Sequence, residues 1–243
     1  MDCWADADDV TRVLAAGLEG FAEPLTVRGS LIRPDGSMRQ VGPVWHNLPS
    51  DTCDQTVLEL GALAARDVGT PNARESCDPA DQILAVVLQH FIAAEVSVRG
   101  TVEPEQGEIR LLSCHGLDED LGQGVWRDAT VLDQHTGAVR RQHVTTKPIA
   151  TIPADGGTRT AAVLPRVRNA PTLTPALLMW VTDLANALVE EISGAVSFEL
   201  AVLGGTIHLL SCRPVTGTHR PPVGGVTTDS SGAGARASAP TAL

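Results

Sequence analysis

The chain has 243 residues, a formal net charge of −11 and 43% hydrophobic residues. That length suits one domain or two small ones, and that composition suits a globular protein with a core. The negative charge argues against general binding to nucleic acid or to an anionic membrane, because both favour a basic surface. Only 3% of the residues are aromatic and none is tyrosine, so we expect a core of aliphatic side chains.

Targeting and cysteine patterns predict a cytoplasmic protein. The segment Met1–Asp9 is acidic where a secretory signal peptide is basic. No apolar run approaches the roughly 20 residues that span a bilayer, so no membrane association is expected. The five cysteines are scattered and form no C-x-x-C pair, which is typical of reduced thiols rather than of a disulfide framework or a zinc site.

The first part of the chain is predicted to combine helices and strands. Apolar periodicity predicts helices at Asp6–Gly20 and Asp54–Ala65, the second with Val57, Leu58, Leu60 and Leu63 facing inward, and a strand at Leu25–Ile32. The segment Arg33–Ser50 contains turn signals at Pro34-Asp35-Gly36 and Gly42-Pro43, and Gly69–Pro79 is expected to be a loop. Periodicity leaves Ile83–Ile92 open between strand and helix, and its β-branched residues favour a strand.

Further along, hairpins precede one well-marked helix. Two strands are expected within Thr101–Ser113 around Pro104–Gly107, and a second hairpin within Gly124–Val144 around Gln134–Gly137. The segment Pro148–Pro171 has little pattern and is expected to be exposed. Thr174 as N-cap, Pro175 at the first position and Gly194 at C′ delimit a helix over Pro175–Ile192. Its expected apolar face consists of Leu177, Val181, Leu184, Leu188 and Ile192.

The segment Val196–Val215 is predicted to be a β-hairpin that turns at Gly204-Gly205, because apolar residues alternate with others before the turn. Two registers are open. A two-residue loop puts Glu199 opposite Leu210, whereas a three-residue loop, Gly204–Thr206, puts it opposite Ser211 with Arg213 on the same face. Apolar pairing alone slightly favours the shorter loop.

This hairpin resembles the closing hairpin of the nucleotide-binding domain in the pyruvate phosphate dikinase and phosphoenolpyruvate synthase family. Phe198–Pro214 reads F-E-L-A-V-L-G-G-T-I-H-L-L-S-C-R-P and is similar without a gap to the family's I-E-W-A-x-x-D-G-x-L-Y-x-L-Q-x-R-P. Glu199, Arg213 and Pro214 match, and Ser211 stands where the family has glutamine. The resemblance requires the three-residue loop, which we therefore expect.

Further similarities extend the resemblance from about Leu25 to Val215. The segment Ile109–Asp128 is similar to the family's G-L-G-E motif with its later glycine and aspartate, matching at Gly116, Leu117, Glu119, Gly124 and Asp128. Asp118 replaces the motif's middle glycine, and Lys147, the only lysine of the chain, falls where the family usually has one. Val27–Ser30 is similar to the family's V-R-S-S, and Val86–Ser97 to its V-x-Q-x-M-V strand beside the adenine, with Gln89 as the glutamine.

The resemblance implies an α+β fold of the ATP-grasp type, with a mixed or antiparallel sheet and flanking helices, incomplete at the N-terminus. It implies one ATP-binding domain over residues 1–215, with sub-lobes at about 1–80 and 81–215. The remaining segment, 216–243, is low in large apolar residues and is predicted to be a disordered tail.

The resemblance also implies a site for ATP and Mg²⁺. Glu199 and Ser211 would hold the metal, Arg28 and Arg213 would act catalytically on the phosphates, and Gln89 and Glu119 would contact the nucleotide. The residues by themselves leave simpler interpretations open. Glu199 and Arg213 could form a surface ion pair, Glu119 could be an ordinary loop carboxylate, and Arg28 could be an arginine on a solvated strand edge.

We therefore expect an ATP–Mg²⁺-binding protein, and, if it is active, an ATP-dependent phosphotransferase (kinase) or part of one. A separate protein that carries the family's histidine domain or the missing lid is a candidate partner. The alternative is a degenerate, non-catalytic relative that serves as a scaffold or regulatory subunit. Ser211, Asp118 and the short N-terminus favour the alternative.

Overall fold

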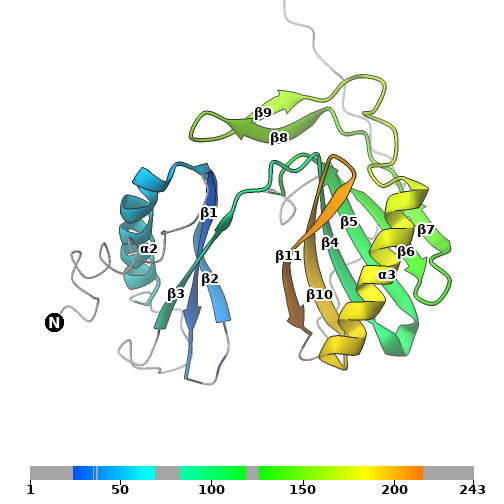
Figure 1. Ribbon diagram of the computed structural model, residues 1–243, viewed down its shortest axis with the longest axis horizontal. Coiled ribbons are helices and arrows are strands. Elements are labelled where there is room, and N and C mark those ends of the chain that lie inside the picture. The colour runs from blue at the N-terminus through cyan, green and yellow to red at the C-terminus, as the bar shows by residue number, and fades with distance from the viewer. Residues whose placement is uncertain (1–23, 35, 37, 69–82, 119–125, 216–243) are drawn as a thin grey trace, which may run out of the picture.

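The computed structural model describes residues 24–34, 36, 38–68, 83–118 and 126–215. The helix expected at Asp6–Gly20, the loop at Gly69–Pro79 and the tail at 216–243 lie outside the described residues. Within them the chain forms two antiparallel sheets, a separate two-stranded hairpin and two α-helices, which confirms the α+β class. Figure 1 shows a smaller lobe and a larger lobe side by side, with the separate hairpin across the top.

The smaller lobe is a three-stranded sheet in the order β2-β1-β3 with one helix packed on it. Its strands are β1 (Leu25–Ile32), β2 (Met38–Leu48) and β3 (Ile83–His90), and the 3-10 turn Ser50–Thr52 leads into helix α2 (Cys53–Val68). Leu25, Val27 and Leu31 alternate along β1 and pack against Leu60 of α2, which is fully buried. β3, which follows the division expected near residue 80, pairs with β1, so this sheet extends to His90.

Two expectations for the smaller lobe were wrong. The Gly42-Pro43 turn signal lies inside β2, which pairs with β1 on both sides of it. β2 is an edge strand, where the missing N–H of proline is tolerated, and Gly42 takes a left-handed φ of +65° where the pairing register shifts. Leu58 of α2 was expected to face inward but is 43% exposed, because the sheet covers only the face with Val57 and Leu60.

The larger lobe is a six-stranded antiparallel sheet in the order β11-β10-β4-β5-β6-β7. Its strands are β4 (Val96–Glu103), β5 (Glu108–His115), β6 (Asp128–Asp133), β7 (Val139–His143), β10 (Val196–Leu203) and β11 (Thr206–Pro214). The expected hairpins around Pro104–Gly107 and Gln134–Gly137 are confirmed. Helix α3 (Pro175–Ile192) covers one face of this sheet, and the other face carries the polar residues of β4 and β10.

Helix α3 begins and ends as predicted. The hydroxyl of Thr174 accepts a hydrogen bond from the backbone N–H of Leu177. The left-handed residue at the C-terminus is Ser193, with φ +56°, rather than Gly194. The buried centre of its apolar face is formed by Leu178, Val181 and Ala185, and most of the predicted face lies at the margins. No helix within the described residues has the length and apolarity needed to cross a membrane.

A hairpin of β8 (Ile149–Ala154) and β9 (Gly157–Ala162) bridges the two lobes, in a segment whose weak pattern predicted no strand. The side-chain amide of Asn47 on β2 donates hydrogen bonds to the carbonyls of Ala154 and Gly157. On the other side, the N–H of Leu117, just beyond β5, donates to the carbonyl of Thr151 at 2.8 Å. The hairpin therefore connects β2 of the smaller lobe with the end of β5.

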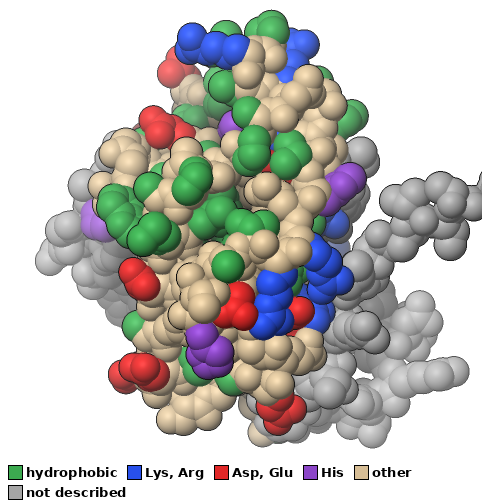
Figure 2. Space-filling view, turned by 90° about the vertical axis from the view of Figure 1, so that its right-hand side faces the viewer, with side chains coloured by type: hydrophobic (Ala, Val, Ile, Leu, Met, Phe, Trp, Pro, Cys, Tyr) green, Lys and Arg blue, Asp and Glu red, His purple; other side chains and the backbone are tan. Residues whose placement is uncertain are grey.

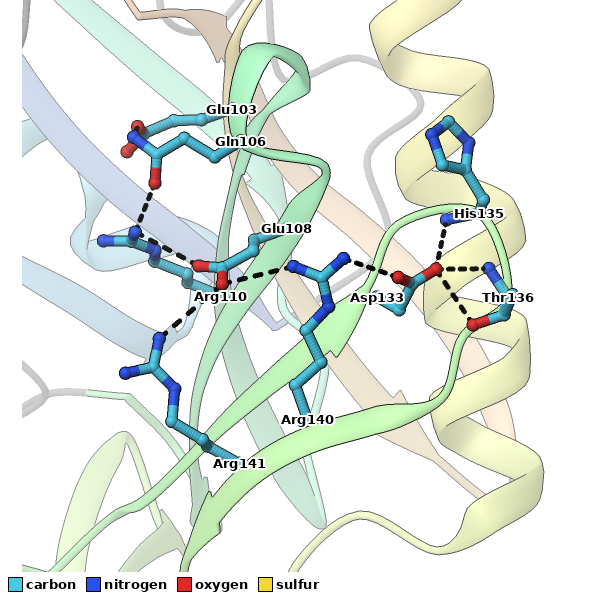
Figure 3. Close-up of polar contacts among 9 residues, drawn as sticks. All are labelled: Glu103, Gln106, Glu108, Arg110, Asp133, His135, Thr136, Arg140 and Arg141. Atoms are coloured by element: carbon cyan, nitrogen blue, oxygen red, sulfur yellow. Dashed lines mark hydrogen bonds and ion pairs between the residues drawn. The ribbon is translucent and has the colours of Figure 1, made fainter.

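Ion pairs cover the far edge of the larger sheet. Glu108 on β5 lies beside three guanidinium groups, those of Arg110, Arg140 and Arg141, and Arg140 also contacts Asp133 at 2.6 Å (Figure 3). Figure 2 shows basic side chains lying against acidic ones on this side of the molecule, with a separate group of hydrophobic side chains beside them. Each of the three arginines has a carboxylate partner, so these charges have a structural role at this edge.

Candidate functional site

Arg28 is the side chain that connects the two lobes. Alternation along β1 places Val27 on the helix-packed face and therefore turns Arg28 to the opposite face. Its guanidinium donates to the amide oxygen of Gln89 on β3 at 2.8 Å and to the carbonyl of Leu210 on β11 at 3.1 Å. It also lies 3.6 Å from the carboxylate of Glu199 on β10. Arg28 therefore joins its own sheet to two strands of the larger one.

Glu199 lies directly opposite Ser211 in the β10–β11 hairpin, as the resemblance required. The Ser211 hydroxyl donates a hydrogen bond to the Glu199 carboxylate at 3.0 Å. The predicted three-residue loop is wrong, because Leu203 pairs with Thr206 and leaves only Gly204 and Gly205 in the turn.

A β-bulge at Leu210 shifts the register of β11 by one residue, so that Glu199 faces Ser211 despite the two-residue loop. Leu200 pairs with Leu209 and Glu199 with Ser211, so Leu210 is the extra residue on β11. The carbonyl of Leu210 accepts the hydrogen bond from Arg28. The bulge therefore both aligns Ser211 with Glu199 and offers an acceptor to the other lobe.

Two predicted site residues are not part of this cluster. Arg213 follows Ser211 on the same face of β11 and pairs with Ser197, but its side chain is exposed and forms no hydrogen bond or ion pair with any described residue. The interpretation of Arg213 and Glu199 as an ion pair is therefore not what the structure shows. Glu119 lies outside the described residues.

Sequence reasoning missed Arg99, and it treated Asp118 only as a departure from the motif. Arg99 on β4 lies directly opposite Glu199 on β10. Its guanidinium is 3.4 Å from Glu199 and 3.2 Å from Asp118. Alternation in the sequence was a partial signal, since it places Arg99 on the face of β4 opposite Val98 and Gly100, and the pairing of β4 with β10 then puts that face beside Glu199.

These residues form one lobe-junction cluster, which consists of Arg28, Gln89, Arg99, Asp118, Glu199 and Ser211. The carboxylate of Glu199 lies between two guanidinium groups, one from each lobe. The side chains of Arg28, Glu199 and Arg99 are 25%, 29% and 37% exposed, so all three can be reached from solvent. Guanidinium groups bind phosphate oxygens, and carboxylate and hydroxyl oxygens suit Mg²⁺. The donor set therefore fits a phosphate-bearing ligand with a divalent cation.

Three other residues of the resemblance, Gly116, Asp128 and Lys147, support the fold and lie away from the lobe junction. Gly116 takes a left-handed φ of +75°, and a Cβ there would lie 2.1 Å from the carbonyl oxygen of Thr151. Only glycine therefore allows β5 to end against the β8–β9 hairpin. Lys147 is fully buried, and its ammonium contacts Asp128 at 2.6 Å. These residues hold the hairpin and the β6 end in place rather than facing the lobe junction.

An apolar groove of about 470 Å³ lies elsewhere, on the helix-covered face of the larger sheet. It is lined by Trp180, Leu184, Gly205, Thr206, Ile207 and Leu209. None of these residues belongs to the lobe-junction cluster, and none carries a charge that could bind phosphate or a metal. We therefore place the candidate site at the lobe junction and not in the groove.

The thiol of Cys114 is poorly suited to act as a nucleophile, and the described residues contain no cluster of metal ligands. Burial, followed by the charge of Asp118, raises the pKa of the Cys114 thiol to about 12, so the thiol stays protonated at neutral pH. No group of three or more His, Cys, Asp or Glu side chains suited to a metal ion occurs within the described residues. Any cation held by Glu199 and Ser211 would therefore take its remaining ligands from water or from a bound phosphate.

Comparison with known proteins gives one distant similarity, and no family model matches the chain. The chain is 29% identical over 212 residues to the prodigiosin synthesizing transferase PigC of Serratia marcescens. The matched region takes in 83% of this chain and 24% of that protein, so the chain spans about a quarter of the length of the relative. The similarity is to one part of a larger protein that is named as a transferase.

Proposed function

We propose that this chain binds ATP with Mg²⁺ at the lobe-junction cluster and serves as the nucleotide-binding part of an ATP-dependent transferase. The observation that carries the proposal is the convergence of Arg28, Gln89, Glu199 and Ser211, which come from four different strands in two sheets. All four were selected from sequence similarity to one nucleotide-binding domain, and three stretches of chain had to fold together for them to meet.

The similarity to a transferase supports the reaction class, although the chain spans about a quarter of that relative. The proposed relation to the nucleotide domain of pyruvate phosphate dikinase and phosphoenolpyruvate synthase, and with it the ATP-grasp identity of the fold, rests on the motifs of the hairpin and of Gly116–Asp128. In this proposal the transfer is of a phosphoryl group. A separate protein with the histidine domain or the lid remains the proposed partner.

Four residues of the cluster, and the neighbouring Arg213, have a defined task in the proposed site. Bound ATP supplies the phosphoryl group, and Mg²⁺ neutralises its charge. Glu199 and Ser211 offer oxygen ligands to the cation, and Arg28 donates to phosphate oxygens from the smaller lobe. Gln89 holds the Arg28 guanidinium through the 2.8 Å hydrogen bond and so fixes its direction. The exposed Arg213, two residues from Ser211 on the same strand face, is free to meet the terminal phosphate.

A non-catalytic role is the second candidate, and one observation favours it. Glu199 already accepts a hydrogen bond from Ser211 and pairs with Arg28 and Arg99. Such a network satisfies its own charges and could simply hold the two lobes together. The two candidates differ in whether ATP displaces these contacts.

Calorimetric titration of the whole chain with ATP, with and without Mg²⁺, tests the proposal. ATP–Mg²⁺ at about 100 times its dissociation constant should stabilise the folded state by about 2.7 kcal/mol in thermal unfolding. Arg28→Ala should weaken ATP binding about tenfold or more with or without metal, since it removes a charged hydrogen bond to phosphate. Absence of both heat and thermal shift at millimolar ATP–Mg²⁺ would favour the non-catalytic role.

Glu199→Gln gives a sharper result because its effect should change sign with the metal. With Mg²⁺ the variant loses a metal ligand, so we expect about tenfold weaker ATP binding. Without Mg²⁺ the variant loses a carboxylate that competes with phosphate for Arg28 and Arg99, so affinity should be equal or higher. Ser211→Gln should leave affinity for ATP–Mg²⁺ equal or higher. Glu191 is an exposed residue of α3, and Glu191→Gln is the matched control that should change neither titration.

A further inference from the structure

Arg99 occupies a position in the lobe-junction cluster that neither the motifs nor the proposed function assigns. It comes from β4, the strand next to β10, and faces Glu199 across the strand pair. One nitrogen of its guanidinium, Nη2, contacts both Asp118 at 3.2 Å and Glu199 at 3.4 Å. Its Nε is buried and has no hydrogen-bond partner among the described residues. The guanidinium is thus held through one end only.

The two arginines of the cluster approach Glu199 from opposite sides. Arg99 contacts Oε1 from the larger lobe, and Arg28 contacts Oε2 from the smaller lobe. When Glu199 binds a cation, its charge is no longer available to either guanidinium. Two partly exposed arginines, one from each lobe, would then face the same ligand with charge available for its phosphates, Arg28 still held by Gln89 and Arg99 by Asp118.

We propose that Arg99 is a second phosphate-binding residue, which contacts the polyphosphate of a nucleoside triphosphate from the side opposite Arg28. This inference rests on the proposed function and adds a residue to that site. Binding exchanges ion pairs and breaks no covalent bond, because the cation takes Glu199 and the phosphates take Arg28 and Arg99. Asp118 holds Arg99 in the free protein and competes with the ligand for it.

The test compares Arg99→Ala with Arg110→Ala in the whole chain. Arg110 is a matched control because it lies on the same face of the neighbouring strand β5, also has a buried Nε without a partner among the described residues, and also pairs with a carboxylate. Its partner, however, is Glu108 at the start of β5, outside the lobe-junction cluster (Figure 3). The probes are ATP, inorganic tripolyphosphate and adenosine, each titrated by calorimetry with thermal unfolding alongside.

Arg99→Ala should weaken binding of ATP and of tripolyphosphate by the same factor, about tenfold or more, and leave adenosine binding unchanged. Arg99→Lys should keep part of the affinity, since it retains the charge but not the forked donors. Arg110→Ala should bind all three probes like the parent. Asp118→Asn should bind ATP up to about fivefold more tightly, with or without Mg²⁺, because it removes a weak competing ion pair.

Three results would overturn the inference. Equal loss of adenosine and tripolyphosphate binding in Arg99→Ala would mean that Arg99 only maintains the fold. Weaker ATP binding by Asp118→Asn that appears only with Mg²⁺ would make Asp118 a metal ligand instead. If Arg99→Ala binds ATP like the parent while Arg28→Ala binds it more weakly, Arg99 is not a phosphate-binding residue, but the proposed function stands. If the parent chain itself binds no ATP, the proposed function fails and the role of Arg99 fails with it.

Discussion

Replacing Lys147 with methionine should destabilise the folded chain by about 3–5 kcal/mol, because it leaves a buried carboxylate without its cation. The side chains of Lys147 and Asp128 are 0% and 1% exposed, and their charged atoms are 2.6 Å apart. Asp128 also accepts hydrogen bonds from the backbone N–H groups of Thr145 and Thr172 and from the Thr172 hydroxyl. These donors partly stabilise the Asp128 carboxylate without Lys147, but none of them carries a full positive charge. Urea unfolding followed by circular dichroism measures the change.

The matched control is Arg140→Met at the sheet edge. Arg140 and Asp133 are also 2.6 Å apart, but their side chains are 41% and 22% exposed, so water replaces the lost partner. Arg140→Met should therefore lose much less stability than Lys147→Met. The double variant Lys147→Met with Asp128→Asn should be more stable than Lys147→Met alone, since no unpaired charge stays buried. Equal, small losses for both methionine variants would refute the reasoning from burial.

Three further outcomes can be measured on the whole chain. Gly100→Ala should lower the free energy of unfolding in urea by about 1–3 kcal/mol, because the added Cβ would lie 2.0 Å from the Phe198 ring. Phe198→Leu in the same chain should restore part of that stability, and no restoration would indicate a backbone effect instead. Burial lowers the pKa of His115 below its ordinary value, so the unfolded state takes up the proton first and stability should fall as the pH drops below the ordinary histidine range; His115→Gln should lessen that fall, and an unchanged pH profile would contradict the assignment. Cys114, with its thiol pKa raised to about 12, should resist iodoacetamide at about pH 8 in the folded chain and react after unfolding. Peptide mass spectrometry measures the labelling, and rapid labelling of the folded chain would contradict the buried position of the thiol.

Strong local signals allowed some elements to be predicted to the residue. The strand Leu25–Ile32 and the helix Pro175–Ile192 begin and end where the sequence placed them. In the strand, alternation of buried and less buried residues sets in from Val27 onward, and in the helix Thr174 and Pro175 mark the first turn. Such signals act over a few residues and do not depend on the rest of the fold.

The missed strands depended on context that local signals lack. Gly42-Pro43 is typical of a turn, but at the edge of a sheet the same dipeptide is compatible with a bulged strand. In the β8–β9 hairpin the signal was present, since Asp155-Gly156 is a favoured turn dipeptide and Gly156 has φ +66°. The flanking strands, however, carry few large apolar residues, so their alternation was too weak to be recognised.

The candidate site shows the same division between local and long-range information. Similarity to a known hairpin selected Glu199 and Ser211, and the structure does place them opposite each other. The reason given was wrong, because the register is set by the bulge at Leu210 and not by a longer loop. Arg99 escaped prediction because its role depends on which strand lies beside β10, and strand order in a sheet cannot be derived from alternation within one strand.

The β8–β9 hairpin gives the molecule the mechanics of a closed frame. The chain itself passes once from β3 to β4, and a single passage of this kind would act as a hinge. The hairpin joins the lobes a second time, at Asn47 on one side and at Leu117 on the other. Two separated joints oppose rotation about either of them, and the contacts of Arg28 with β10 and β11 add to that restraint. On the side of the smaller lobe, the side-chain amide of Asn47 donates the hydrogen bonds of that second joint, so its loss would leave the lobes joined by the chain itself and by the Arg28 contacts.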